Sequence, residues 1–222
     1  MNLPINLQEQ LRQELDIQRD ALNSSAGALD ASTIIIKNRT FEFPDGERNE
    51  GPMHCIILDW RYLSSYFPNA FDEANTKPPI CFSRGKAEAQ MAPSDRSDEP
   101  QNEDCPTCVQ NQFGSKFPHD KDNHAKACKN EILLAVVKNE KPTEDTTPLL
   151  IKLSPGAITN FRNFVKGLQN TKSLLPCQVA VDLNFDPKIT KWAKLTYSNP
   201  KTHIWMEDIL KIRAEAQTVL DI

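Results

Sequence analysis

The stretch "CPTCVQNQFGSKFPHDKDNHAKAC", residues 105–128, contains three of the chain's six cysteines but few side chains that could build a core. Cys105 and Cys108 are separated by two residues, a spacing at which a tight turn brings two thiolates to one ion. Cys128 follows Cys108 after 19 residues, and 23 residues separate Cys81 from Cys105. We therefore expect these four cysteines to hold one structural zinc ion, with no open position for catalysis.

The fourth ligand of this site has three candidates, which are Cys81, His119 and His124. We favour Cys81 because the prolines of "PPIC" stiffen the backbone, whereas both histidines lie among Asp and Lys residues. Four ordinary reduced cysteines, or a redox-active Cys-x2-Cys pair, are the alternatives to a metal site. Cys55 and Cys177 lie in or beside apolar stretches, and we expect both in the core.

A metal would also account for the folding of the polar segment from about residue 80 to about residue 130. This segment has too few apolar side chains to fold by burial alone, and zinc binding can supply on the order of 10 kcal/mol. Within it, residues 83–104 are rich in Pro, Ser and acidic residues, so we expect a mobile surface loop there.

The composition is that of a globular protein with one core and an insertion: 222 residues, 39% hydrophobic and 25% charged. No apolar stretch approaches the roughly 18 residues that a membrane span needs, and the N-terminus lacks the features of a signal peptide. We therefore expect no membrane association and a cytoplasmic location. In a reducing compartment, paired cysteines indicate metal ligands or redox groups before disulfides.

The remaining pattern predicts a small barrel that is mainly β with flanking helices. Apolar or alternating runs predict strands at Thr33–Lys37, His54–Tyr62, Glu131–Val137, Leu149–Ser154, Gln178–Phe185 and Ile189–Tyr197. Helical spacing predicts helices at Leu7–Leu22, Pro155–Leu168 and Met206–Leu220. The segment "RTFEF" could continue the first strand, and residues 63–80 are expected to form a short helix or loop.

This order fits an OB-like five-stranded barrel with a zinc-stapled insertion between its second and third strands. We divide the chain into an N-terminal helix and linker (1–32), the barrel with its insertion at about 80–130 (33–205), and a C-terminal helix (206–222). The terminal helices could cap the barrel or join subunits of a homo-oligomer.

Charge and aromatic content indicate an anionic partner. Residues 146–205 carry a net charge of +6, which leaves −10 on the rest of the chain. Aromatic faces stack nucleic-acid bases for about 1–3 kcal/mol each, and ammonium groups displace counterions from phosphates. The candidate DNA-binding residues are Trp60, Arg61, Tyr62, Phe113, Lys116, Phe117, Lys126, Lys152, Lys191, Trp192 and Lys194. Weaker candidates for the nucleic-acid backbone are Arg162, Lys166, Lys172 and Lys188.

Each of these residues also has a purely structural interpretation. Phe113 and Phe117 could pack over the zinc turn, Trp192 could be covered by a helix, and one member of the 60–62 group is expected to enter the core. Exposed lysines are common on any globular domain.

The segments "PPICFSRG", "CPTCVQNQFGS", "KACKNEILLAVV" and "LLIKLSPGAITNFRNFVKGL" together resemble bacteriophage-encoded single-stranded DNA-binding or replication-associated proteins. The resemblance covers about residues 35–200 and is specific in the cysteine block. It implies Cys105, Cys108 and Cys128 as ligands with Cys81 as the fourth, an OB-like barrel, and the cytoplasm of a bacterial host. The chain departs from many such proteins by ending in "RAEAQTVLDI" rather than in an acidic tail that recruits partners.

We therefore expect a non-catalytic protein that binds single-stranded DNA in phage DNA replication, recombination or repair, with replication or host proteins as further partners. The alternative is a zinc-stapled interaction or regulatory protein that binds a host protein. An enzyme is not expected, because the sequence lacks paired carboxylates, a nucleophile elbow and a glycine-rich phosphate loop. The pair His119 and Asp120 looks catalytic but is more typical of a solvated loop.

Overall fold

The computed structural model describes residues 32–69, 77–117, 122, 124–138, 141–189 and 193–221. The strands are β1 (Thr33–Lys37), β2 (Thr40–Glu42), β3 (Arg48–Asn49), β4 (Met53–Tyr66), β5 (Cys81–Gly85), β6 (Cys128–Lys138), β7 (Leu149–Leu153), β8 (Val179–Phe185) and β9 (Leu195–Thr202). The α-helices are α2 (Pro155–Lys172) and α3 (Met206–Asp221), and three 3-10 turns are η1 (Glu88–Gln90), η2 (Val109–Asn111) and η3 (Pro176–Gln178).

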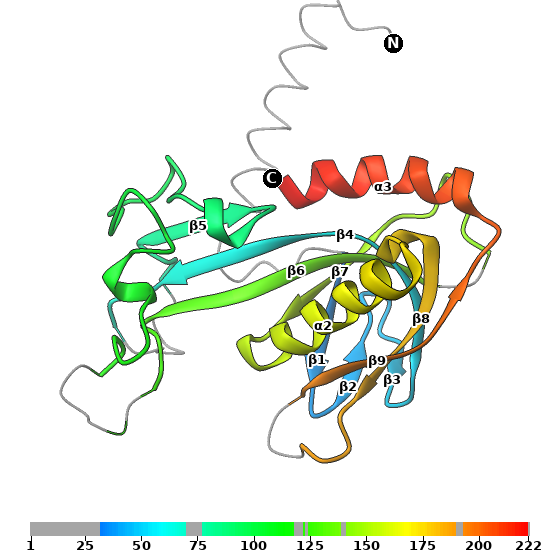
Figure 1. The fold of residues 1–222 in the computed structure, drawn as a ribbon, viewed down its shortest axis with the longest axis horizontal. Helices are drawn as coiled ribbons and strands as arrows, with labels where there is room; N and C mark the ends of the chain where they lie inside the picture. The colour runs from blue at the N-terminus through cyan, green and yellow to red at the C-terminus, as the bar shows by residue number, and fades with distance from the viewer. Residues whose placement is uncertain are drawn as a thin grey trace, which may run out of the picture.

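The strands form one curled, mixed sheet with the order β3-β2-β1-β7-β6-β4-β8-β9, and β5 adds to β4 beside this path. Neighbouring strands are antiparallel except β1 and β7, which pair in parallel. The order begins at β3 and ends at β9, so the described strands make a half-barrel with two edges. In Figure 1, β4 and β6 continue as a pair beyond the curled part toward β5.

The two helices cover opposite faces of this sheet, because successive residues of a strand point to opposite faces. On β6, Ile132 and Leu134 belong to the core cluster that contains Phe161 of α2. Leu133 and Ala135 belong instead to the cluster that contains Ile209 and Ile212 of α3 (Figure 1). Cys55 and Cys177 are buried in these two clusters, as expected.

Helix α2 has local signals at both ends. Ser154 precedes it in an extended conformation and Pro155 occupies its first position, where a missing N–H costs nothing. Ser173 ends it in the left-handed conformation, and its N–H donates to the carbonyl oxygens of Leu168 and Gln169. Among the described residues, no helix has the length and apolar content needed to cross a membrane.

In the described part of the chain the sheet contains nine strands rather than the five expected. One reason is that "RTFEF" does not continue β1: Asn38 and Arg39 have positive φ angles of 50° and 62°, which make a two-residue turn into β2. Another is that β5 arises within the insertion. Residues 63–66, expected in a helix or loop, extend β4 instead.

The last strand begins later than expected. The N–H groups of Lys188 and Ile189 donate to Asp186, which fixes a turn where the expected strand Ile189–Tyr197 should begin. Strand β9 therefore covers Leu195–Thr202. Helix α3 confirms the expected C-terminal helix, and the expected helix at Leu7–Leu22 lies outside the described residues.

Residues 83–104 were expected to form a mobile loop, but their backbone is held to its surroundings. Ser94 donates its N–H to the carbonyl of Phe82, and Cys105 donates to that of Met91 at 2.9 Å. Met91 is only 3% exposed and anchors the segment. Long-range pairs such as these have no signature in local composition.

Candidate nucleic-acid interface

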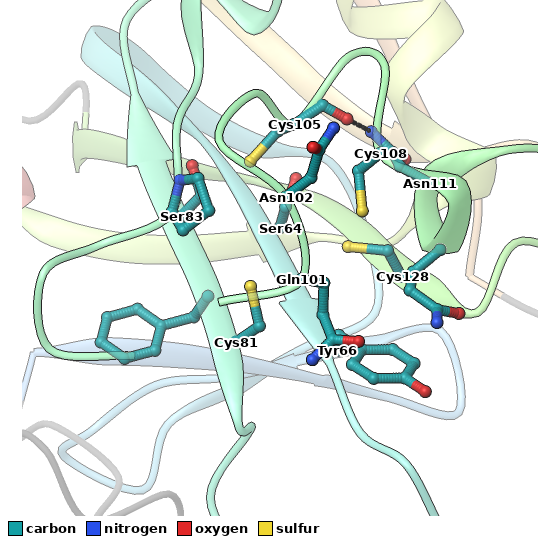
Figure 2. Close-up of a pocket in the computed structure, with 13 residues that line it drawn as sticks. Ser64, Tyr66, Cys81, Ser83, Gln101, Asn102, Cys105, Cys108, Asn111 and Cys128 are labelled. Atoms are coloured by element: carbon teal, nitrogen blue, oxygen red, sulfur yellow. Dashed lines mark hydrogen bonds between the residues drawn. The ribbon is translucent and has the colours of Figure 1, made fainter. Parts of the chain in front are cut away.

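Strand register gathers the four expected cysteines. Tyr66 on β4 pairs with Cys81 on β5 and with Cys128 on β6, so the two cysteines begin strands on either side of the same residue. Directly paired residues point to the same face of a sheet, which places both thiols on one face. Cys105 and Cys108 approach this face from the following turn. Figure 2 shows the four sulfur atoms around a common space, a cavity of about 20 Å³.

The Cys-x2-Cys turn is built by hydrogen bonds. Cys108 donates its N–H to the carbonyl of Cys105 at 3.3 Å, and Asn111 donates its own to Cys108 at 2.9 Å. The buried side chain of Asn111 donates Nδ2–H to the Cys105 carbonyl at 2.9 Å (Figure 2). The carboxylate of Asp104 accepts from the N–H and the hydroxyl of Thr107. These bonds fix the positions of two thiols before any ion is present.

Three of the four cysteines are buried and Cys128 is half-buried, but together they do not form a coordination shell. Cys81, Cys105 and Cys108 are each 8% exposed. Within the described ranges, no three Cys, His, Asp or Glu side chains lie in an arrangement that would hold an ion directly. Two strand spacings, about 10 Å, separate the backbones of Cys81 and Cys128, so their side chains must lean together over Tyr66 to share a ligand.

For two of these thiols, those of Cys105 and Cys128, the surroundings favour the protonated form while no cation is bound. Burial raises the pKa of Cys105, although the Ser83 hydroxyl beside it opposes the rise. Burial, followed by the proximity of the other three thiols, raises the pKa of Cys128 to about 11. Mutual repulsion of this kind is relieved when a divalent cation replaces the protons. Four sulfur donors around one small cavity suit zinc better than a hard cation such as magnesium.

Of the alternative fourth ligands, Cys81 lines the cavity, whereas His124 lines a separate groove. His119 lies outside the described residues.

Asn111 joins the cysteine turn to β6. Its Oδ1 accepts from Nδ2–H of Asn130 at 2.7 Å and from Nζ of Lys126 at 3.2 Å. Asn130 in turn accepts, at its Oδ1, a hydrogen bond of 2.8 Å from the hydroxyl of Ser64 on β4. The side chain of Asn111 thus connects the thiol cavity with β6, and residues of β6 line the neighbouring groove.

A basic groove of about 1190 Å³ lies between α2 and the segment that carries the cysteines. We call that segment, described residues 77–117 and 124–130, the cysteine unit. The groove is lined by Phe67, Pro68, Asn69, Lys77, Pro78, Ile80, Glu88, Phe113, Lys116, His124, Ala125, Lys126, Ala127, Cys128, Lys129, Asn130, Pro155, Ile158, Thr159 and Arg162. Among these described lining residues, five are Lys or Arg and one is acidic.

Exposed aromatic rings accompany the basic groups. Phe113 is 78% exposed, and Nζ of Lys126 lies 4.9 Å from its ring centroid. Phe67, at the end of β4, is 41% exposed. Phe117 is also exposed, with Nζ of Lys116 at 5.5 Å from its ring, but it does not line the groove. Phe113 therefore does not pack over the cysteine turn but presents a free ring face.

Several expected DNA-binding residues lie elsewhere. Arg61 is only 1% exposed and donates Nε–H to Asp221 of α3 at 2.5 Å, so it is a core residue and the DNA-binding prediction for it is wrong. Trp60 is half-buried and packs against the core cluster, with its ring edge-on to Phe161 at a centroid distance of 5.2 Å. Tyr62 is half-buried beneath the guanidinium of Arg162, whose central carbon lies 5.5 Å from the ring centroid.

Two further candidates, Lys152 and Lys194, are described but do not line the groove. Lys152 is exposed on β7, and Lys194 lies 3.9 Å from the carboxylate of Asp186. Lys191 and Trp192 fall outside the described residues.

Sequence reasoning missed Phe67 and Lys77 and placed Arg162 among the weaker candidates. The motif "YFPN" signals an aromatic residue at a strand end, but nothing local pairs it with a helix almost a hundred residues later. The length of β4 and β6 makes that connection, because it carries the cysteine unit out beside α2.

Comparison with known proteins identifies no relative for this arrangement. No protein-family model, no curated protein and no solved structure matches the chain.

Proposed function

We propose that the protein binds single-stranded DNA, without catalysing a reaction, in the basic groove between α2 and the cysteine unit. The observation that supports this most directly is the combination of Phe113 and Phe67, both exposed, with five cationic side chains in one groove. Rings of this kind stack unpaired bases, and the cations neutralise phosphates. The groove exceeds the roughly 300–1,000 Å³ of small-molecule sites, which favours a polymer as ligand.

The cationic groups come from both walls, so a strand in the groove would be held from two sides. Lys77, Lys116 and Lys126 belong to the cysteine unit, and Arg162 belongs to α2. Lys129 also lines the groove, although its Nζ lies 2.8 Å from the carboxylate of Glu131 and is partly neutralised by it. None of these contacts requires a particular base, so we expect binding with little sequence preference.

The four cysteines support this groove as a structural zinc site. Cys81, Cys105, Cys108 and Cys128 would hold the ion, which would fasten the cysteine turn against β4, β5 and β6. Asn111 would carry that rigidity to Lys126 beside Phe113. A wall with few apolar side chains of its own would then stay open and ordered.

Titration of labelled oligo-dT at several salt concentrations, followed by fluorescence anisotropy, tests the proposal. We expect Phe113→Ala to weaken binding by about 1–3 kcal/mol, the contribution of one stacked base. Val109→Ala is the matched control, because Val109 is 76% exposed in the same unit but does not line the groove.

Charge variants test the same groove independently. Lys77→Ala should weaken binding and reduce the salt slope by about 0.7, the value for one phosphate contact on a single strand. Lys152→Ala removes an exposed lysine outside the groove and should change neither quantity. Equal effects of the two lysine variants, or no binding by the wild type at low salt, would contradict the proposed site.

A further inference from the structure

One acidic side chain interrupts the basic groove. Glu88, in the 3-10 turn η1 of the cysteine unit, forms an ion pair and hydrogen bond with the guanidinium of Arg162 on α2. It is the single carboxylate among the described residues that line the groove. The pair therefore spans the groove from one wall to the other.

The ion pair is partly exposed, so another anion can replace Glu88 as the partner of Arg162. The side chains of Arg162 and Glu88 are 37% and 47% exposed, so water and ions reach both. The guanidinium also lies over the ring of Tyr62, at 5.5 Å, which keeps it in place when the carboxylate leaves. A backbone phosphate is tetrahedral, but its two non-bridging oxygens can accept hydrogen bonds from the guanidinium as the two oxygens of a carboxylate do.

We infer that Glu88 competes with DNA phosphate for Arg162 and thereby sets the affinity and the salt dependence of the groove. The inference rests on the proposed function of the groove. In the free protein Arg162 is already paired with Glu88. When its guanidinium turns to a phosphate, the freed carboxylate of Glu88 leaves a negative charge beside the strand, and this charge offsets the counterion release of that one contact. Glu88 thus reduces the number of phosphate contacts that appear in the salt slope by one.

This competition has a consequence for selectivity. A single small anion gains too little from Arg162 alone to replace a carboxylate already in contact. A single-stranded polymer gains the lysines and the aromatic rings at the same time, so it can displace Glu88. Glu88 is therefore a specificity-determining residue that reserves Arg162 for a polyanion.

The test is a double-mutant cycle on the full chain with labelled oligo-dT. Glu88→Gln keeps the shape of the side chain but removes its charge. We expect it to bind up to about fivefold more tightly than the wild type, the range of an exposed ion pair, with a salt slope steeper by about 0.7. In the Arg162→Gln background the same change should leave the slope unaltered, because no guanidinium remains to be released.

Glu103→Gln is the matched control, because it removes one exposed negative charge from the cysteine unit outside the groove. It should leave the salt slope unchanged. Wild-type affinity and slope in Glu88→Gln, or weaker binding by that variant, would overturn the inference while oligo-dT binding by the wild type still supports the proposed function. Absence of wild-type binding would overturn both.

Discussion

The buried carboxamide of Asn111 offers the sharpest test of how the cysteine unit is held together. Replacing Asn111 by Ala removes the donor to the Cys105 carbonyl, at 2.9 Å, and the acceptor of the Asn130 amide, at 2.7 Å. Each bond contributes about 1 kcal/mol, and a buried group left unpaired costs about 1–3 kcal/mol more. Lys126 loses a third bond but can turn to water. We therefore expect the free energy of unfolding to fall by about 3–5 kcal/mol.

Urea unfolding, followed by circular dichroism, measures this loss, and two variants separate its parts. Asn111→Asp keeps the acceptor for Asn130 and Lys126 but loses the donor to Cys105, so it should retain about half of the stability difference. Gln112→Ala removes a neighbouring amide that donates to the carbonyls of Pro106 and Cys108 from an exposed position. If Asn111→Ala cost no more than Gln112→Ala, the carboxamide would not fasten the unit, and the proposed link between thiol cavity and groove would fail.

Two further predictions concern the metal and the pH dependence. The wild type should bind one zinc ion per chain, and Cys108→Ser should lose both the ion and much of its thermal stability, whereas Cys177→Ala should keep the ion; metal analysis after dialysis decides this. Arg61 donates a hydrogen bond to Asp221 and lowers the pKa of that carboxyl in the folded protein. The bond therefore contributes fully to stability above the unfolded-state pKa of about 3.9. Its contribution is lost as the pH falls through the lower folded-state pKa. Asp221→Asn should flatten that acid limb in thermal unfolding, and an unchanged limb would contradict this account.

Local sequence patterns were sufficient to predict the strands and helices whose apolar residues recur at regular spacing. The alternation of Val179–Phe185 predicted β8, and the proline and apolar spacing of Pro155–Leu168 predicted α2, although its last turn runs on to Lys172. Local patterns failed where a contact with a residue far away in the sequence determines whether a side chain is buried. Arg61 reads as a surface cation, but Asp221, 160 residues away, makes it a buried one.

The candidate site was likewise predictable from the sequence only in part. Spacing indicated Cys105, Cys108 and Cys128, because Cys-x2-Cys restricts what the backbone can do, and the stiff "PPIC" segment favoured Cys81 as the fourth. The structure places these four cysteines around one cavity. Phe113, Lys116 and Lys126 were recognised from composition, and the structure places them along one groove. The opposite wall was not recognisable, since Arg162 and Pro155 belong to a helix whose closeness depends on the register of two long strands.

The register of β4 and β6 positions both the cysteine unit and the groove. Pairing of β4 with β6 runs from Cys55 and Lys138 to Tyr66 and Cys128, well past the curled part of the sheet. At the outer end of this ribbon, the described helices do not pack over both faces, and polar side chains replace apolar ones: Ser64 and Ser83 line the thiol cavity, and Asn130 accepts a hydrogen bond from Ser64. A strand extension of this kind cannot be stabilised by a core. The Asn111 network is one substitute, and the zinc ion that we propose would be a second. The polar surface at this end of the ribbon is the surface on which we propose that DNA binds.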